Sequence, residues 1–185
     1  MFRISRDHKA GRIRRLAHGL YTTNLDEPPE RLVRRLLWEI VSLLFPGAVV
    51  SARTALGGEP ARDGSVFLTS DTDRDVELPG VLLRARKGPG RLPGDTPMHG
   101  VYVASRARAY LENMQTTRAR RSVSRSVSRY ELEQRIAADL RERGVKYMQG
   151  VMREAKGIAG RLGMKGELRE LEGVVAGVVG MRRPV

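Results

Sequence analysis

Cationic side chains are concentrated near the start of this sequence, where they are suited to binding phosphate. Residues 1–24 hold six lysines and arginines against a single acid, Asp7. Such groups bind the phosphates of a nucleic-acid backbone and displace its condensed counterions. We expect this segment to contact duplex DNA in a strongly salt-dependent way. The residues expected to do so are Arg3, Arg6, Lys9, Arg12, Arg14 and Arg15.

A second segment, residues 115–129, holds five arginines and no acid. Its alternation of serine and arginine (SVSRSVSR) is a low-complexity repeat with few apolar residues, which predicts a mobile linker or arm. The two segments together carry ten of the thirteen excess positive charges of the chain. We expect the arm to make a second DNA contact, in the minor groove or by folding on binding. The residues assigned to it are Arg118, Arg120, Arg121 and Arg125.

The remaining residues give no pattern that favours catalysis. The chain has no cysteine, and its three histidines lack the spacing of a metal site. Asp71, Asp73 and Asp75 alternate as in a calcium loop, but the glycine and glutamate of that motif are missing. The sequence KGPGRLPGD lacks the Gly-Lys-Ser/Thr of a phosphate loop, and its prolines favour a rigid connector. We therefore expect a protein that is not an enzyme and uses no metal or cofactor.

Length and composition favour a folded protein that does not enter a membrane. The chain has 185 residues, of which 41% are hydrophobic, so it can bury a core. Its N-terminus lacks the apolar run of a signal peptide, and no window reaches the ~18 apolar residues of a membrane span. Aromatic residues make up 5% of the chain, too few for a platform that stacks single-stranded bases. These features predict a cytoplasmic protein that binds duplex DNA.

Hydrophobic periodicity indicates which elements position the first basic segment. Ile13 and Leu16 alternate with basic residues, Gly19 marks a turn, and the apolar pattern resumes at Leu20. This pattern predicts a β-hairpin or wing, and we assign residues 1–24 to a reduced winged-helix element.

Residues 25–114 are expected to form a central domain of mixed α/β structure. A helix can begin at Pro28-Pro29 and continue to residue 44, with apolar residues on more than one face. Short β-branched runs at 48–50 and 100–104 predict strands, and those at 65–69, 75–78 and 81–86 predict a strand meander. Helices are expected at 52–56 and from Ser105, as the cap, to residue 114.

Residues 115–129 are read as the linker, and residues 130–185 as a C-terminal helical region. Leu132, Ile136 and Leu140 recur at a spacing of four, and further helical patterns span 145–162 and 167–179. Gly144 and Gly163 divide these helices. The fold class is therefore α+β, with a reduced N-terminal winged element, a central α/β region and a C-terminal helical unit.

Three motifs in one order resemble the AbiEi-type antitoxin regulators of bacterial type IV toxin–antitoxin systems. GRIRRLAHGLYT resembles the wing of their winged helix-turn-helix. VVSARTAL resembles their Val-Ser-x-x-(Ser/Thr)-Ala-Leu helix, and VASRARAYLENM resembles their Ala-Ser-x-x-Arg helix. The resemblance is clearest from Arg12 to Met114 and covers about two-thirds of the chain. It departs from the family in one respect, because about ten residues precede Gly11 where the family places two or three helices.

The resemblance implies a transcriptional regulator that binds operator DNA and represses or neutralises a partner toxin, usually a nucleotidyltransferase. In this family the middle region and the helical C-terminus are associated with toxin neutralisation or homodimer contacts. Because a recognition helix is missing from the pattern, we expect contacts to the DNA backbone rather than readout of bases.

Two alternatives remain open. GLYTTN and LFPGAVVS are also similar to regions that precede Fic domains in larger bacterial proteins. The chain lacks the His-Pro-Phe-x-x-Gly-Asn-Gly-Arg motif of Fic catalysis, so this similarity implies a sensor or adaptor module that acts through protein contacts. The other alternative is a basic structural protein without a dedicated ligand.

Overall fold

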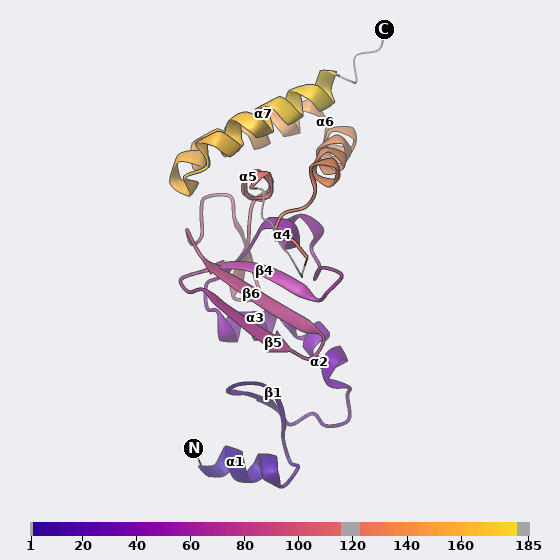
Figure 1. The fold of residues 1–185 in the computed structure, drawn as a ribbon, viewed down its shortest axis with the longest axis vertical. Helices are drawn as coiled ribbons and strands as arrows, with labels where there is room; N and C mark the ends of the chain where they lie inside the picture. Colours follow the sequence, from indigo (N-terminus) through magenta and orange to yellow (C-terminus); the bar gives the residue numbers. More distant parts are fainter. Residues whose placement is uncertain (1, 116–122, 181–185) are drawn as a thin grey trace.

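The computed structural model describes residues 2–115 and 123–180. A six-stranded mixed sheet lies at the centre, with helices packed on both of its faces (Figure 1). A small helix-and-hairpin unit lies at one end of the molecule, and two C-terminal helices lie at the other. The expected α+β class is confirmed at this level, with helices and two sheets in one chain.

The N-terminal unit contains the hairpin expected from the alternation of Ile13 and Leu16 with basic residues. Strands β1 (Arg14–Ala17) and β2 (Leu20–Thr22) pair antiparallel, with Arg15 opposite Tyr21. Helix α1 (Phe2–Lys9) precedes the hairpin and was not anticipated from the sequence. Its apolar residues are too few to give a helical period, which is the signal that sequence reasoning depends on.

The central sheet has the strand order β5-β6-β4-β3-β8-β7. Its β4–β6 and β3–β8 pairs are parallel, and the other pairs are antiparallel. The expected strands are present, but the meander is wrong, because β6 lies between β4 and β5. One edge strand with Pro97 was missed, and proline is tolerated at an edge because its missing N–H is not needed there. The strands are β3 (Val49–Val50), β4 (Ser65–Ser70), β5 (Arg74–Leu78), β6 (Val81–Lys87), β7 (Thr96–Met98) and β8 (Val101–Val103).

One face of the sheet is covered by α2 (Pro29–Arg35) and α3 (Leu37–Leu44), where the sequence predicted a single helix. The two helices are separated at Leu36, whose backbone leaves helical geometry at φ −105° and ψ 22°. The break turns apolar residues on more than one side of the segment toward a common core. Val33 and Val41 are fully buried there against Leu68 and Leu83 of the sheet.

On the other side of the sheet, α4 (Ala52–Gly57) packs against β4 and against α5 (Arg106–Met114), and the C-terminal helices α6 (Arg129–Leu162) and α7 (Lys165–Gly180) pack on α5. Gly144, at φ 81°, interrupts the helical backbone of α6, and Gly163 ends that helix, as the sequence predicted. Leu111 of α5, Ile136 of α6 and Leu171 of α7 belong to one hydrophobic core. The C-terminal helices are therefore packed against the central region by a shared interior.

Polar residues of the two central motifs have structural roles. Ser105 caps α5 by accepting a hydrogen bond from the Arg108 amide, and Thr54 Oγ1 accepts one from the Phe67 amide of β4. The Glu112 carboxylate accepts a 2.7 Å bond from the amide of Ala52, whose φ of 49° is unusual for a residue with a Cβ. These contacts join α4 and α5 to each other and to the sheet.

In the described part of the chain, no helix combines the length and the apolar character that crossing a membrane would require.

Candidate nucleic-acid interface

The hairpin is attached to the body of the protein through its inner side. Leu16 is buried in the core beneath α2 and α3, and Ala17 and Leu20 pack against the same cluster. The Arg14 guanidinium donates to the carbonyls of Leu25 and Glu27, at 2.9 and 3.0 Å. These bonds fasten the hairpin to the segment that leads into α2. Arg14 therefore has a structural role in addition to its charge.

Helix α1 is held to the hairpin by two contacts. Arg12 Nε lies 3.0 Å from Asp7 Oδ1, which is an ion pair between the end of α1 and the start of the hairpin. The His8 and Tyr21 rings meet edge to face at 5.9 Å between centroids. Of the α1 side chains that the structure describes, none belongs to either core cluster. The helix therefore projects from the molecule and leaves most of its surface open to solvent (Figure 1).

Three of the predicted cations in this unit face solvent without a carboxylate partner. Arg6 and Lys9 are exposed on α1, and neither has a hydrogen bond or an ion pair to another described side chain. Arg15 is exposed on β1, where its guanidinium contacts the Ala17 carbonyl and the His18 ring and no described carboxylate. Arg3 belongs to α1, but its side chain lies outside the described part of the structure. Arg6, Lys9 and Arg15 are named the N-terminal cation set below.

Positive charge continues onto α2, which the sequence analysis did not include in the interface. Arg31 and Arg34 are exposed on this helix. Arg35 donates to Glu27, and this hydrogen bond lowers the pKa of the Glu27 carboxyl. The Glu27 carboxylate, at the point where Arg14 attaches the hairpin, is thus already paired with a cation. The signal that could have found these cations is their spacing at 31, 34 and 35 on the polar side of a helix.

Arg125, assigned to a flexible DNA contact, is bound inside the protein. Its guanidinium donates to Ser51 Oγ at 2.7 Å, to Thr69 Oγ1 at 3.0 Å and to the Leu68 carbonyl at 3.1 Å. Burial lowers the pKa of this guanidinium below its ordinary value, although the nearby Glu112 carboxylate opposes the shift. The expectation that Arg125 is free to bind DNA is therefore wrong. Its donors are used by the ends of β3 and β4.

Residues 123–128, here named the strap, lie against α4 and β4 rather than forming a free arm. Arg53 of α4 donates to the Ser124 and Ser126 carbonyls, both at 3.0 Å, and its backbone amide donates to the Arg125 carbonyl. The Val127 amide donates to Asn113 Oδ1 at 2.8 Å. Each end of the strap is thus hydrogen-bonded to the central domain. Arg118, Arg120 and Arg121 lie outside the described residues.

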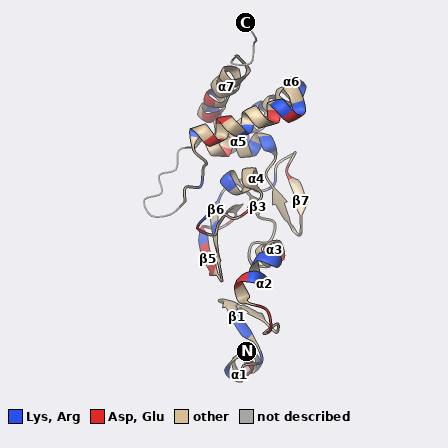
Figure 2. Cartoon of the chain, turned by 90° about the vertical axis from the view of Figure 1, so that its right-hand side faces the viewer, with Lys and Arg blue, Asp and Glu red and all other residues tan. Residues whose placement is uncertain are grey.

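The two basic segments do not form one surface in the described structure. The N-terminal unit lies below the sheet, whereas Arg125 is bonded at α4 and β4, on the side toward the C-terminal helices (Figure 1). Figure 2 shows the same separation from a second direction, with α1 and β1 at the end opposite α6 and α7. The site that the structure presents is therefore the N-terminal unit alone.

No protein-family model, curated protein or solved structure matches this chain. The function of the chain is therefore inferred from the residues and contacts described above.

Proposed function

We propose that this chain binds duplex DNA through α1 and the β1–β2 hairpin, as a transcriptional regulator of the antitoxin type. The observation that carries the proposal is the projecting N-terminal unit with the N-terminal cation set on its surface. The one acid within α1 and the hairpin, Asp7, is paired with Arg12, so this unit itself presents no free carboxylate to a polyanion. Phosphate contacts of this kind position a protein on the duplex and carry little sequence information.

The order of elements in this unit supports the same function. A short helix is followed directly by a hairpin, which is the order of a recognition helix and its wing in the regulators that the motifs resemble. Among the described side chains, those of Asp7 and His8 in the C-terminal half of the helix hold it to the hairpin. Its remaining surface is free to approach a groove, and the hairpin is free to lie along the adjacent backbone.

Binding of labelled duplex DNA, followed by fluorescence anisotropy, tests the proposal. The test variant replaces Arg6, Lys9 and Arg15 together by alanine. The matched control replaces Arg161, Lys165 and Arg169, three exposed cations at the other end of the molecule. Both variants lose three charges, so a general effect of net charge acts equally on both. We expect the test variant to bind at least about tenfold more weakly, since each lost phosphate contact removes favourable counterion release.

Equal loss in the two variants would contradict a localised interface and would favour non-specific attraction by the whole surface. The regulatory part of the proposal rests on the three motifs and has its own test. A reporter fused to the promoter upstream of the gene should be repressed by the chain and released by the test variant. Co-purification with a nucleotidyltransferase-like protein encoded nearby tests the antitoxin role.

A further inference from the structure

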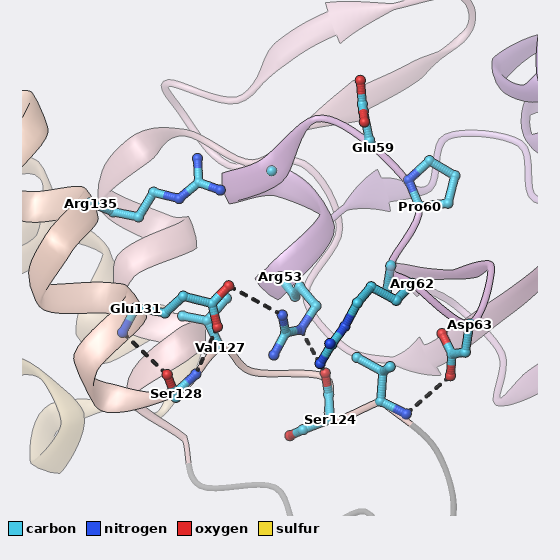
Figure 3. A pocket seen from close by; sticks show the side chains of 13 residues that line it. Arg53, Glu59, Pro60, Arg62, Asp63, Ser124, Val127, Ser128, Glu131 and Arg135 are labelled. Carbon is cyan, nitrogen blue, oxygen red and sulfur yellow. Dashed lines mark hydrogen bonds and ion pairs between the residues drawn. The ribbon is translucent and has the colours of Figure 1, made fainter.

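A cavity of about 1060 Å³ lies between α4, the loop that follows it, the strap and the first turns of α6 (Figure 3). It is separate from the N-terminal unit and shares no residue with the proposed DNA contact. Its volume is slightly above the range of about 300–1,000 Å³ that small-molecule pockets occupy.

Three arginines from separate segments line this cavity: Arg53 on α4, Arg62 in the following loop and Arg135 on α6. Arg53 is committed to the strap carbonyls and lies 3.5 Å from Glu131. Arg135 donates once, to the Leu56 carbonyl at 3.1 Å. Arg62 is exposed and makes no hydrogen bond or ion pair with any described residue. Arg62 and Arg135 therefore retain most of their N–H donors.

Two of the acids in the cavity wall already have partners. Asp63 accepts from the amides of Ser65 and Val123, at 3.0 Å each. Partial burial raises the pKa of the Asp63 carboxyl, but these hydrogen bonds outweigh burial and lower it. Glu131 completes the cap of α6 by accepting from the Ser128 amide. The third acid of the wall, Glu59, is exposed and has no hydrogen bond or ion pair to a described residue, so the free groups of the cavity are the guanidinium donors of Arg62 and Arg135 and this one carboxylate.

We propose that this cavity binds a small phosphate-bearing molecule, with its anionic oxygens held by Arg62 and Arg135. A planar guanidinium donates two parallel N–H groups to a phosphate, which gives both affinity and orientation. Arg53 holds the strap in place and acts as a positioning residue, since its donors are used. The remaining volume accommodates a group attached to the phosphate, such as a nucleoside. The ligand site is independent of the proposed DNA-binding function.

Isothermal titration calorimetry with inorganic pyrophosphate tests this site, with ionic strength held constant by chloride. Wild-type protein should bind one pyrophosphate saturably. Replacing both Arg62 and Arg135 by alanine should weaken binding at least about tenfold, because charge-assisted bidentate bonds are lost. The control replaces Arg141 and Arg169, two exposed arginines that do not line the cavity. Arg62→Lys, made in the wild-type chain, keeps the charge but loses the planar guanidinium. It should bind pyrophosphate more weakly than wild-type protein, because a lysine cannot form the bidentate bonds.

Three outcomes would overturn the proposal. The first is the absence of saturable pyrophosphate binding, and the second is an equal loss of affinity in the control variant. The third is displacement of pyrophosphate by duplex DNA that disappears when Arg6, Lys9 and Arg15 are replaced by alanine. The last outcome would place the phosphate on the DNA interface. Arg62→Ala alone keeps the test valid if the double variant unfolds, because Arg62 has no described intramolecular bond to lose. Circular dichroism of each variant provides the check on folding. A loss of pyrophosphate binding with intact DNA binding would support the two sites as separate.

Discussion

Arg108 Nη1 lies 2.7 Å from Asp95 Oδ2, and neither side chain is exposed to solvent. The guanidinium also donates to Glu112 Oε1 and to the carbonyls of Pro89 and Gly90, each at 2.8 Å. Asp95 in turn accepts from the amides of Leu92 and Ser105. A buried charge is tolerated only when its hydrogen-bonding groups are satisfied, as they are here. Arg108 thus organises the loop that contains KGPGRLPGD around the start of α5.

Replacing Asp95 by alanine should lower the free energy of unfolding by about 3 kcal/mol, the lower end of the cost of breaking a buried ion pair, because Glu112 remains as the second carboxylate partner of the buried Arg108 charge. Urea denaturation followed by circular dichroism measures this change. Glu133→Ala removes the partner of Arg129 in an exposed pair and serves as the control. That control should cost at most about 1 kcal/mol, as exposed pairs contribute little. Similar losses in the two variants would show that the buried pair has no special role.

The sequence predicted part of this arrangement. Its glycines and prolines correctly indicated a connector without a phosphate-loop motif at residues 87–95. The organising residue could not be found in the same way, because Arg108 lies on a helix far along the chain. An arginine on an amphipathic helix is ordinarily solvated, and only the three-dimensional path of the loop brings two carbonyls and a carboxylate to it.

Arg125→Gln should destabilise the protein without changing its affinity for DNA. The substitution removes a charged donor from Ser51, Thr69 and the Leu68 carbonyl, for which we expect a cost of about 1.5–3 kcal/mol. Thermal unfolding and anisotropy titration on the same preparation measure the two effects. A weaker salt dependence of DNA binding in this variant would mean that Arg125 reaches the phosphate backbone after all.

The error over Arg125 has a physical origin. A run of arginines and serines has the same composition whether it is a solvated arm or an extended segment that supplies donors to carbonyls. The low apolar content of the strap predicts an arm, yet Val127 is buried and Arg53 binds two of the strap carbonyls. Hydrogen bonding by backbone groups leaves no periodic signal in the sequence. Helices with regular apolar spacing, such as α6, were predicted correctly for the opposite reason.

Exposed glycine in the middle of α7 offers a stabilising substitution. A Cβ at Gly173 would meet no atom within 4 Å, so Gly173→Ala should stabilise the protein by about 0.5–1 kcal/mol through reduced backbone entropy in the unfolded chain. Gly64→Ala should have the opposite effect. Gly64 has φ 79°, and a Cβ there would lie 2.7 Å from the Gly80 carbonyl oxygen. Opposite shifts in the thermal midpoint are the expected result, and a stabilised Gly64 variant would contradict the packing described here.

Tyr110 should make stability fall at alkaline pH. Burial and then its 2.6 Å hydrogen bond to Asp139 raise the pKa of the Tyr110 hydroxyl above its ordinary value of 10.0. The native state therefore keeps a proton that the unfolded state releases, so the stabilising contribution is complete below pH 10 and declines above it. Relative to Tyr110→Phe, wild-type protein should lose about 1.4 kcal/mol per pH unit in that range. Urea denaturation of both proteins from neutral pH to above pH 10 measures the difference. Parallel curves would show that Tyr110 ionises equally in both states.

Strand order is the part of the fold that sequence patterns could not determine. Each predicted strand from residue 65 to residue 86 exists, but β6 pairs with both β4 and β5. A meander and this arrangement have the same alternation along each strand and the same turn residues. The difference lies in the parallel β4–β6 pairing, which depends on the connection through β5 and not on local preference. The N-terminal hairpin was easier to predict, because its strands are neighbours in sequence and in space.

DNA binding should lose part of its salt dependence when the N-terminal cation set is removed. Each phosphate neutralised on duplex DNA contributes a slope of about −0.9 to log K against log salt concentration. Replacement of Arg6, Lys9 and Arg15 should therefore make the slope about 2.7 units less negative. Arg161, Lys165 and Arg169, replaced together, should leave the slope unchanged, because they lie at the end of the molecule away from α1. The slope separates a localised contact from long-range attraction, since distant charges are screened within a Debye length of about 10 Å at 0.1 M salt. If the two triple variants change the slope equally, phosphates are neutralised over the whole surface and α1 with its hairpin is not the interface.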